Sequence, residues 1–170
     1  LDALLRLRVT LVAINGQPRY GEYGYVSIDN YGSMRMAVDY LASLGHRRIA
    51  WVGTPGDNSF VRARNKGVAD ACAYLGVDLV YDQPYDAVAH PEQIDDICRG
   101  VLDSGATALC TGDYTAVPII DRWHQCNVEV PRDISVLGYD DMGFRTFDDR
   151  RVTTIGFDKF HMGEIAAEAM

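Results

Sequence analysis

Strand-like and helix-like segments alternate along the whole chain, and this alternation constrains the fold more than any other feature. Short apolar or β-branched runs predict strands, and the segments between them repeat apolar residues with a helical period. Alternation with short loops is typical of a parallel sheet covered by helices on both faces, so the expected fold class is α/β. The predicted strands cover 9–14, 26–28, 49–52, 79–81, 108–111, 134–139 and 152–155, and the predicted helices 31–44, 62–75, 91–103, 113–126 and 160–170.

Every main predicted strand ends in a glycine or a polar residue. In parallel α/β sheets, ligands bind beyond the carboxyl ends of the strands, so one edge of the sheet is the expected binding site. The chain has neither a GxGxxG nor a Walker A sequence, and a bound nucleotide cofactor is therefore not expected. The residues that follow the strands are Asn15, Asp29, Gly53, Gly112 and Asp140.

The charge balance argues against DNA binding by this polypeptide alone. Its 170 residues include 16 basic and 24 acidic ones, which gives a net charge of −8. Non-specific DNA binding needs clustered Lys and Arg, and the only dense basic spots are 47–48 and 150–151.

The cysteines and histidines do not form a metal or catalytic constellation in the sequence. The four cysteines are widely spaced, without a zinc-like spacing, and are expected to be reduced and buried in a cytoplasmic protein. The four histidines fall on unrelated elements, and no Gly-x-Ser-x-Gly motif occurs, so catalysis ranks below binding and no cofactor is expected. No segment has the layout of a membrane span or signal peptide, and the opening residues suggest a piece of a longer protein.

Several segments together resemble the lactose/galactose repressor family of bacterial transcription regulators. They occur in the order and at the spacing of that family and cover nearly the whole chain. These segments are Asp29-Asn30, Leu44-Gly45-His46-Arg47-Arg48-Ile49-Ala50, Arg64-x-x-Gly67, Ala106-Thr107-Ala108-Leu109-Cys110, the run from Val130 to Asp141, and Val152-Thr153-Thr154-Ile155.

The resemblance implies a fold and a domain organisation. Members of the family carry an amino-terminal helix-turn-helix headpiece, followed by a core of two α/β subdomains joined by three crossover strands, like type I periplasmic sugar-binding proteins. Residues 29–155 are expected to form the second (C-terminal) subdomain, and 1–28 with 156–170 to belong to the first (N-terminal) subdomain and the crossovers.

The resemblance also implies a function: the effector-binding core of a cytoplasmic transcriptional repressor. A small polar effector, a sugar or sugar derivative, is expected in the cleft between the two subdomains. Operator DNA would be bound only through the headpiece, which is absent from this sequence, and a homodimer is expected because paired headpieces read palindromic half-sites.

Two charged residues are the main ligand-binding candidates that the resemblance implies. Arg64 matches the effector-binding arginine of the family, and its planar guanidinium could hold two adjacent hydroxyls; without the resemblance it would be a solvated helix residue. Asp140 matches the effector-binding aspartate after the last strand of the subdomain, where a carboxylate accepts hydrogen bonds from hydroxyls. Asp141 is assigned to the turn.

Three further candidates match the crossovers. Asn15 matches a polar position at the end of a crossover strand, although a turn with Gly16 explains it equally well. Phe157 could stack on a sugar ring or belong to the apolar core of the hinge, and Asp158 follows it on the third crossover.

Two more candidates come from loops. Asn58, together with Ser59, lies in the loop before Arg64 and could add hydrogen bonds to a ligand. Tyr85 is a candidate aromatic platform for a ligand.

The chain departs from the family pattern in two places. Gly112 stands where the family usually has an asparagine that contacts the effector, while the next residue, Asp113, is expected to cap a helix. Pro118 falls about one turn into that helix and predicts a kink or an altered start. Both departures leave the identity of the effector open.

Two alternatives share parts of this pattern. A periplasmic sugar-binding protein of an importer would have the same fold, and sequence upstream of the chain would distinguish it by a signal peptide. An α/β enzyme of another type would be recognised by turnover of a bound sugar.

Overall fold

The computed structural model describes residues 10–15 and 23–170. Contacts between residues divide the chain into two compact units. The larger unit is Asn30–Gly156, and the smaller unit combines Leu1–Asp29 with Phe157–Met170. The boundaries predicted from the sequence were 29 and 155, and the assignment of the two units to the two subdomains of the family stays a prediction. Within the described ranges, no helix is long and apolar enough to cross a membrane.

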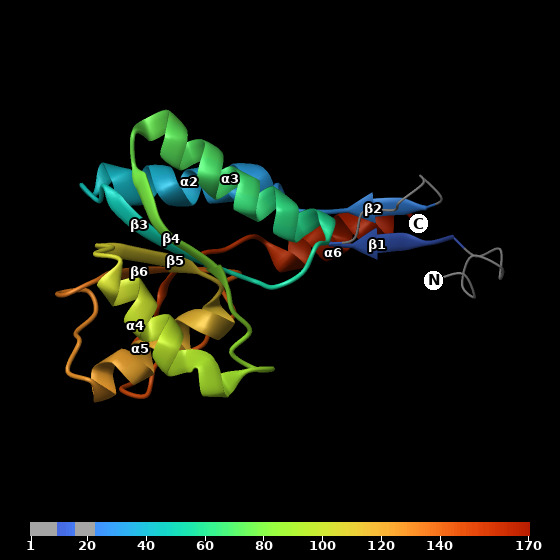
Figure 1. The fold of residues 1–170 in the computed structure, drawn as a ribbon. Coiled ribbons are helices and arrows are strands. Elements are labelled where there is room, and N and C mark those ends of the chain that lie inside the picture. Colours follow the sequence, from blue (N-terminus) through green and yellow to red (C-terminus); the bar gives the residue numbers. More distant parts are fainter. Residues whose placement is uncertain (1–9, 16–22) are drawn as a thin grey trace. The chain divides into compact units, whose positions relative to one another are not determined.

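The larger unit is built on a five-stranded sheet in which every neighbouring pair is parallel. The strand order is β4-β3-β5-β6-β7, so β5 is the middle strand (Figure 1). The predicted parallel α/β fold is therefore confirmed. The strands are β3 (Arg48–Gly53), β4 (Asp78–Pro84), β5 (Ala108–Thr111), β6 (Ser135–Tyr139) and β7 (Thr153–Ile155).

Two helices cover each face of this sheet. Helices α2 and α3 lie side by side on one face, and α4 and α5 lie on the other (Figure 1). A short 3-10 turn, η1 (Pro91–Gln93), precedes α4. The helices are α2 (Asn30–Ser43), α3 (Ser59–Leu75), α4 (Ile94–Asp103) and α5 (Asp113–Gln125). Pro118 lies inside α5, which begins where the sequence predicted.

Each face of the sheet packs against its helices through a mainly apolar core. Alternate residues of the central strands point to opposite faces, so each of these strands is buried on both sides. On the α4–α5 face, Leu109 belongs to a buried cluster with Ala116 and Trp123. On the other face, the fully buried residues of α2 and α3 are Met34, Ala37, Val38 and Val68.

Strand β4 is longer than predicted. The sequence indicated only 79–81, because Asp82 and Gln83 break the apolar pattern. In the structure β4 pairs with β3 from Asp78 to Pro84 along one edge of the sheet. An edge strand has one exposed side, so polar residues are compatible with strand pairing there.

The smaller unit contains β1 (Val12–Ile14), β2 (Gly24–Val26) and α6 (Lys159–Glu168). Strands β1 and β2 are parallel, and α6 packs against both. The predicted strand at 26–28 was wrong by two residues, because the pairing of Val12 with Gly24 sets the register further back. Thr10 and Leu11 of the predicted strand 9–14 do not belong to β1, and Val9 lies outside the described residues.

Candidate functional site

The structure brings the two main candidates, Arg64 and Asp140, into direct contact. Nη2 of Arg64 lies 3.1 Å from Oδ1 of Asp140, although the residues are 76 positions apart in the sequence. Their side chains are only 12% and 26% exposed. Arg64 lies in the second turn of α3, and Asp140 directly follows β6, so the pair lies at the carboxyl end of the sheet.

Arg64 is held by residues that the sequence analysis did not select. Its Nε donates a hydrogen bond to Oδ1 of Asn30 (2.8 Å), at the start of α2. Its guanidinium carbon lies 4.0 Å from the centre of the Tyr139 ring and 5.5 Å from that of Phe60. Such contacts fix the direction of the guanidinium as well as stabilising its charge.

Asn30 and Tyr139, the two residues that hold Arg64, are both buried. Asn30 is 7% exposed and Tyr139 is 1% exposed. Burial raises the pKa of Tyr139, while hydrogen bonds with Ser33 and Arg64 and the charge of Arg64 act in the opposite direction. The sequence did carry one signal for both residues, since each stands directly beside an acidic residue at the carboxyl end of a strand or the start of a helix.

The turn that carries Asp140 has an unusual backbone. Asp140 has φ = 101° and Asp141 has φ = 46°, values that residues other than glycine seldom adopt. The N–H of Asp140 donates to the carbonyl of Ile155 (2.9 Å) on the neighbouring strand. The tight turn therefore places the Asp140 carboxylate at the sheet edge, and its conformation is of the kind that occurs at functional sites.

Asp113 organises this turn, and the prediction that it caps a helix was wrong. The N-cap of α5 is Gly112, and Asp113 is the first helical residue. Its carboxylate accepts hydrogen bonds from the N–H of Met142 (2.8 Å) and from Oγ1 of Thr154 (2.7 Å). A buried carboxylate needs such partners, and by finding them Asp113 joins the start of α5 to the turn after β6.

The two other site candidates of the larger unit, Asn58 and Tyr85, have structural roles in a helix cap and in the apolar core. Asn58 is the N-cap of α3, and its side chain accepts a hydrogen bond from the N–H of Val61 (3.0 Å). Tyr85 is 2% exposed and belongs to the apolar cluster of the α4–α5 face. Among the described residues its hydroxyl has no hydrogen-bond partner. Ligand binding by Asn58 and Tyr85 stays a prediction.

The candidates Asn15, Phe157 and Asp158 belong to the smaller unit. Asn15 follows β1 with φ = 58°, and its N–H donates to the carbonyl of Val26 (2.9 Å), which continues the pairing of β1 with β2. The Phe157 ring lies 5.0 Å from Nζ of Lys159. Asp158 caps α6 by accepting from the N–H of His161 (2.8 Å). Their roles in ligand binding stay predictions.

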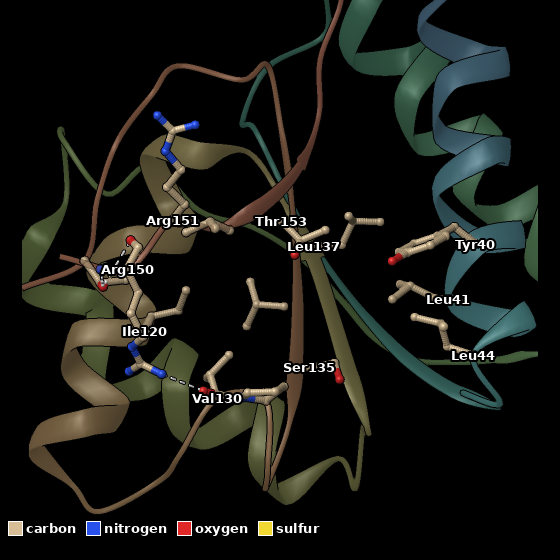
Figure 2. A pocket seen from close by; sticks show the side chains of 14 residues that line it. Tyr40, Leu41, Leu44, Ile120, Val130, Ser135, Leu137, Arg150, Arg151 and Thr153 are labelled. Carbon is tan, nitrogen blue, oxygen red and sulfur yellow. Dashed lines mark hydrogen bonds between the residues drawn. The ribbon is translucent and has the colours of Figure 1, made fainter. Parts of the chain in front are cut away.

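A separate pocket lies at the other end of β6 (Figure 2). It has a volume of about 280 Å³ and lies between α2, β6, β7 and α5. Tyr40 and Leu41 of α2, with Leu44 just after it, face Leu137 across the pocket, and Arg150 donates to the carbonyl of Val130 (2.8 Å) beside it. None of the predicted site residues lines this pocket.

The part of the chain that the structure describes contains no group of three or more His, Cys, Asp or Glu side chains placed to hold a metal ion. Cys72, Cys98 and Cys110 are buried, and burial raises their pKa values, to about 11 for Cys72 and about 12 for the other two. These thiols are therefore protonated near neutral pH.

A family of known proteins matches this fold and sequence. The periplasmic binding protein-like domain matches residues 38–170, which is well over half of the chain. The chain therefore belongs to the periplasmic binding protein-like domain family.

Individual relatives that match the chain are transcriptional regulators. The chain is 33% identical over 152 residues to an uncharacterized HTH-type transcriptional regulator of Streptomyces limosus, covering 86% of this chain and 43% of the relative. It is 27% identical over 176 residues to the ribose operon repressor of Escherichia coli K12, covering 95% and 50%. A solved LacI-family transcriptional regulator from Lactobacillus casei with bound glucose is 25% identical, with a TM-score of 0.76, covering 93% and 60%.

These matches confirm the resemblance to the lactose/galactose repressor family. The chain spans about half the length of the curated relatives it matches.

Proposed function

We propose that this chain is the effector-binding core of a transcriptional repressor and that its effector is a sugar or sugar derivative. The observation that carries the proposal is the contact of Arg64 with Asp140 at the carboxyl end of the sheet. The ribose operon repressor and the glucose-bound regulator among the relatives support a carbohydrate as the ligand class.

The chemistry of the pair fits a polyol. A hydroxyl group both donates and accepts a hydrogen bond, so adjacent hydroxyls can accept from the Arg64 guanidinium and donate to the Asp140 carboxylate. The two charges already satisfy each other without a ligand, and a ligand must therefore replace that contact with bonds of similar strength. An apolar ligand cannot do so, because it has no hydrogen-bonding groups to replace the contact between the two charges.

The proposed activity of the whole protein is coupling between effector and operator. Operator DNA would be bound by an amino-terminal helix-turn-helix in the cytoplasm, with two copies forming a homodimer on a palindromic site. Effector and operator would bias the same conformational equilibrium, so each would change the affinity for the other by the same factor.

Calorimetric titration of the full-length protein with D-ribose and D-glucose tests the proposal. We expect Arg64→Ala and Asp140→Ala each to weaken binding at least tenfold, because each loses a charge-assisted hydrogen bond worth about 1.5–3 kcal/mol. The control is Arg62→Ala, on the same helix, whose side chain is 61% exposed and pairs with Asp57.

Operator binding in the absence of sugar should persist in both site variants, while the response to sugar is lost. Unchanged titration curves for Arg64→Ala and Asp140→Ala would contradict the site assignment.

A further inference from the structure

Helices α2 and α3, which lie side by side on one face of the sheet, form a groove on their outer surface (Figure 1). The groove has a volume of about 340 Å³, and neither Arg64 nor Asp140 lines it. The two helices that form its walls are in close contact, because a Cβ at Gly67 would lie 2.5 Å from the carbonyl oxygen of Tyr31. Backbone packing therefore fixes the position of one wall relative to the other.

The groove carries large apolar and aromatic side chains that are exposed. Met36 of α2 is 56% exposed, and Tyr74 of α3 is 79% exposed. Both side chains line the groove. Methionine, tyrosine and arginine are enriched at the centres of protein interfaces, so this combination indicates a contact surface.

Arg35 also lines the groove, and its guanidinium is held by two aromatic rings. The guanidinium carbon lies 5.8 Å from the ring centre of Tyr31 and 5.9 Å from that of Tyr74. The charge of Arg35 acts on Asp70, but the Asp70 carboxylate already accepts hydrogen bonds from Lys66 (2.5 Å) and Tyr31 (2.8 Å). Among the described residues, no ion pair or hydrogen bond joins Arg35 to an acidic side chain.

Asp39 lines the same groove one helical turn after Arg35. The two residues have the i, i+4 spacing at which opposite charges can pair on a helix, but the basic residue comes first, which is the weaker order. Within the part of the chain that the structure describes, Asp39 has no ion pair, and Arg35 stacks on the tyrosines instead. The α2 surface therefore presents a positive and a negative charge that do not neutralise each other.

This arrangement of charges is complementary to itself. A two-fold axis that places two α2 helices antiparallel brings Arg35 of each copy opposite Asp39 of the other, and the same ion pair forms twice. The two charges sum to zero, whereas the whole chain carries a net charge of −8 and a copy is repelled elsewhere. A partner with charge of a single sign would be attracted by one of the two residues and repelled by the other.

We infer that the α2–α3 groove is a homotypic interface and that its occupant is the same groove of a second copy of this chain. Met36 and Tyr74 form the apolar centre of the contact, and Arg35 donates to Asp39 of the partner subunit. Because two rings already hold the guanidinium, it loses little freedom when it binds. The interface goes beyond the proposed function, since it involves neither a sugar nor the Arg64–Asp140 pair.

Charge reversal tests the pairing. Sedimentation equilibrium of the full-length protein compares wild type with Arg35→Asp and Asp39→Arg. Each variant brings like charges together across the contact, so each should weaken self-association about tenfold or more. At a concentration where wild type is associated, each variant should therefore have half its mass. Mixing the two variants in equal amounts again places acidic opposite basic side chains and should restore the wild-type mass.

Arg99→Asp is the matched control. It changes the net charge as Arg35→Asp does, and its side chain is 68% exposed, but it lies on α4 at the opposite face of the sheet. It should keep the wild-type mass. Circular dichroism should show equal helix content in wild type and all three variants, so that a lower mass reports lost association of a folded protein.

The masses decide between a second copy and other occupants of the groove. Halved masses in both single variants, restored by mixing, support the homotypic contact. Wild-type mass in either single variant, or wild type with the mass of Arg35→Asp, overturns the inference, because the groove is then solvated or covered by a different partner. Halved masses that mixing does not restore also overturn it, since Arg35 then does not pair with Asp39. The proposed sugar binding stands in each case, because this experiment contains no sugar.

Discussion

The amino-terminal edge of the five-stranded sheet, where its strands begin, and the carboxyl edge, where they end, both carry arginines. These arginines have different kinds of hydrogen-bond partner. At the amino-terminal edge, Nε of Arg48 donates to the carbonyl of Gly105 (2.9 Å), and Nη1 of Arg47 donates to that of Ala42 (2.8 Å). At the carboxyl edge, Arg64 donates to the side chains of Asn30 and Asp140.

The two edges differ in whether a ligand could replace the hydrogen-bond partners of their arginines. Carbonyls at helix ends and turns need partners in every state of the folded protein, so Arg47 and Arg48 act as fixed structural donors. Side-chain partners can exchange one hydrogen bond for another when a ligand arrives. The carboxyl edge is therefore suited to binding, although the two edges contain the same residue types.

Glycine substitutions should give the largest difference in unfolding free energy between the two edges. A Cβ at Gly138 would lie 2.1 Å from Oδ1 of Asp113, a buried carboxylate fixed by two hydrogen bonds. We expect Gly138→Ala to lower the free energy of unfolding by about 3 kcal/mol. Gly105→Ala should cost only about 1 kcal/mol, because its strain is a positive φ of 70° and its neighbour is the flexible end of Arg48. Urea denaturation measures both.

A double variant identifies the cause of the larger effect. If the clash with the Asp113 carboxylate is responsible, Gly138→Ala combined with Asp113→Ala should lose less stability than the sum of the two single variants. Strict additivity would contradict the proposed clash.

Arginine substitutions should lower the free energy of unfolding at both edges, but should weaken sugar binding at the carboxyl edge alone. Arg64→Met removes charge-assisted bonds in a largely buried setting and should cost about 2 kcal/mol, whereas Arg48→Met should cost about 1 kcal/mol. Only Arg64→Met should also weaken D-ribose or D-glucose binding in calorimetric titration. A loss of sugar affinity in Arg48→Met would remove the distinction between the edges.

The sequence predicted the strand and helix order because burial on both faces leaves an unmistakable apolar pattern in 49–52, 108–111 and 134–139. It failed where that pattern is weak, at the exposed edge strand β4 and at β2, whose position depends on pairing with β1. Strand boundaries there are set by partners distant in sequence, which local periodicity does not contain.

The candidate site was predictable to a smaller extent. Arg64 and Asp140 came from the family resemblance, and the structure brings them together. Asn30, Tyr139 and Asp113 were missed as supports, because a helix start, a buried strand residue and a first-turn acid each have an ordinary structural explanation. Their roles depend on contacts across α2, α3, β6 and β7, which only the folded chain provides.

The stacking of Arg64 on Tyr139 tests the carboxyl edge through a smaller expected effect. The Arg64 guanidinium lies 4.0 Å from the Tyr139 ring centre, and Tyr139 is 1% exposed. We expect a coupling energy of about 1 kcal/mol between the two side chains in a double-mutant cycle of Tyr139→Leu with Arg64→Met.

Tyr139→Phe keeps the ring and should retain most of this coupling, since the cation faces the π system. A coupling energy near zero in the leucine cycle would show that Tyr139 supports the core alone and does not hold Arg64.

The smallest expected effect is a pH dependence at the amino-terminal edge. Nδ1 of His46 lies 2.9 Å from Oγ1 of Thr107, and burial lowers the pKa of His46 below its ordinary value of 6.5. The folded state therefore prefers the neutral imidazole more than the unfolded state does. This contribution to stability is fully present above pH 6.5 and is lost as the pH falls through the lowered pKa.

Unfolding free energies of wild type and His46→Gln at pH 7.5 and 5.5 measure this contribution. Wild type should lose more stability than the variant between the two values, because glutamine does not titrate. Sugar binding should be the same in both proteins at pH 7.5, since His46 lies at the edge opposite to Arg64. An equal loss of stability in the two proteins would mean that His46 does not distinguish the folded from the unfolded state.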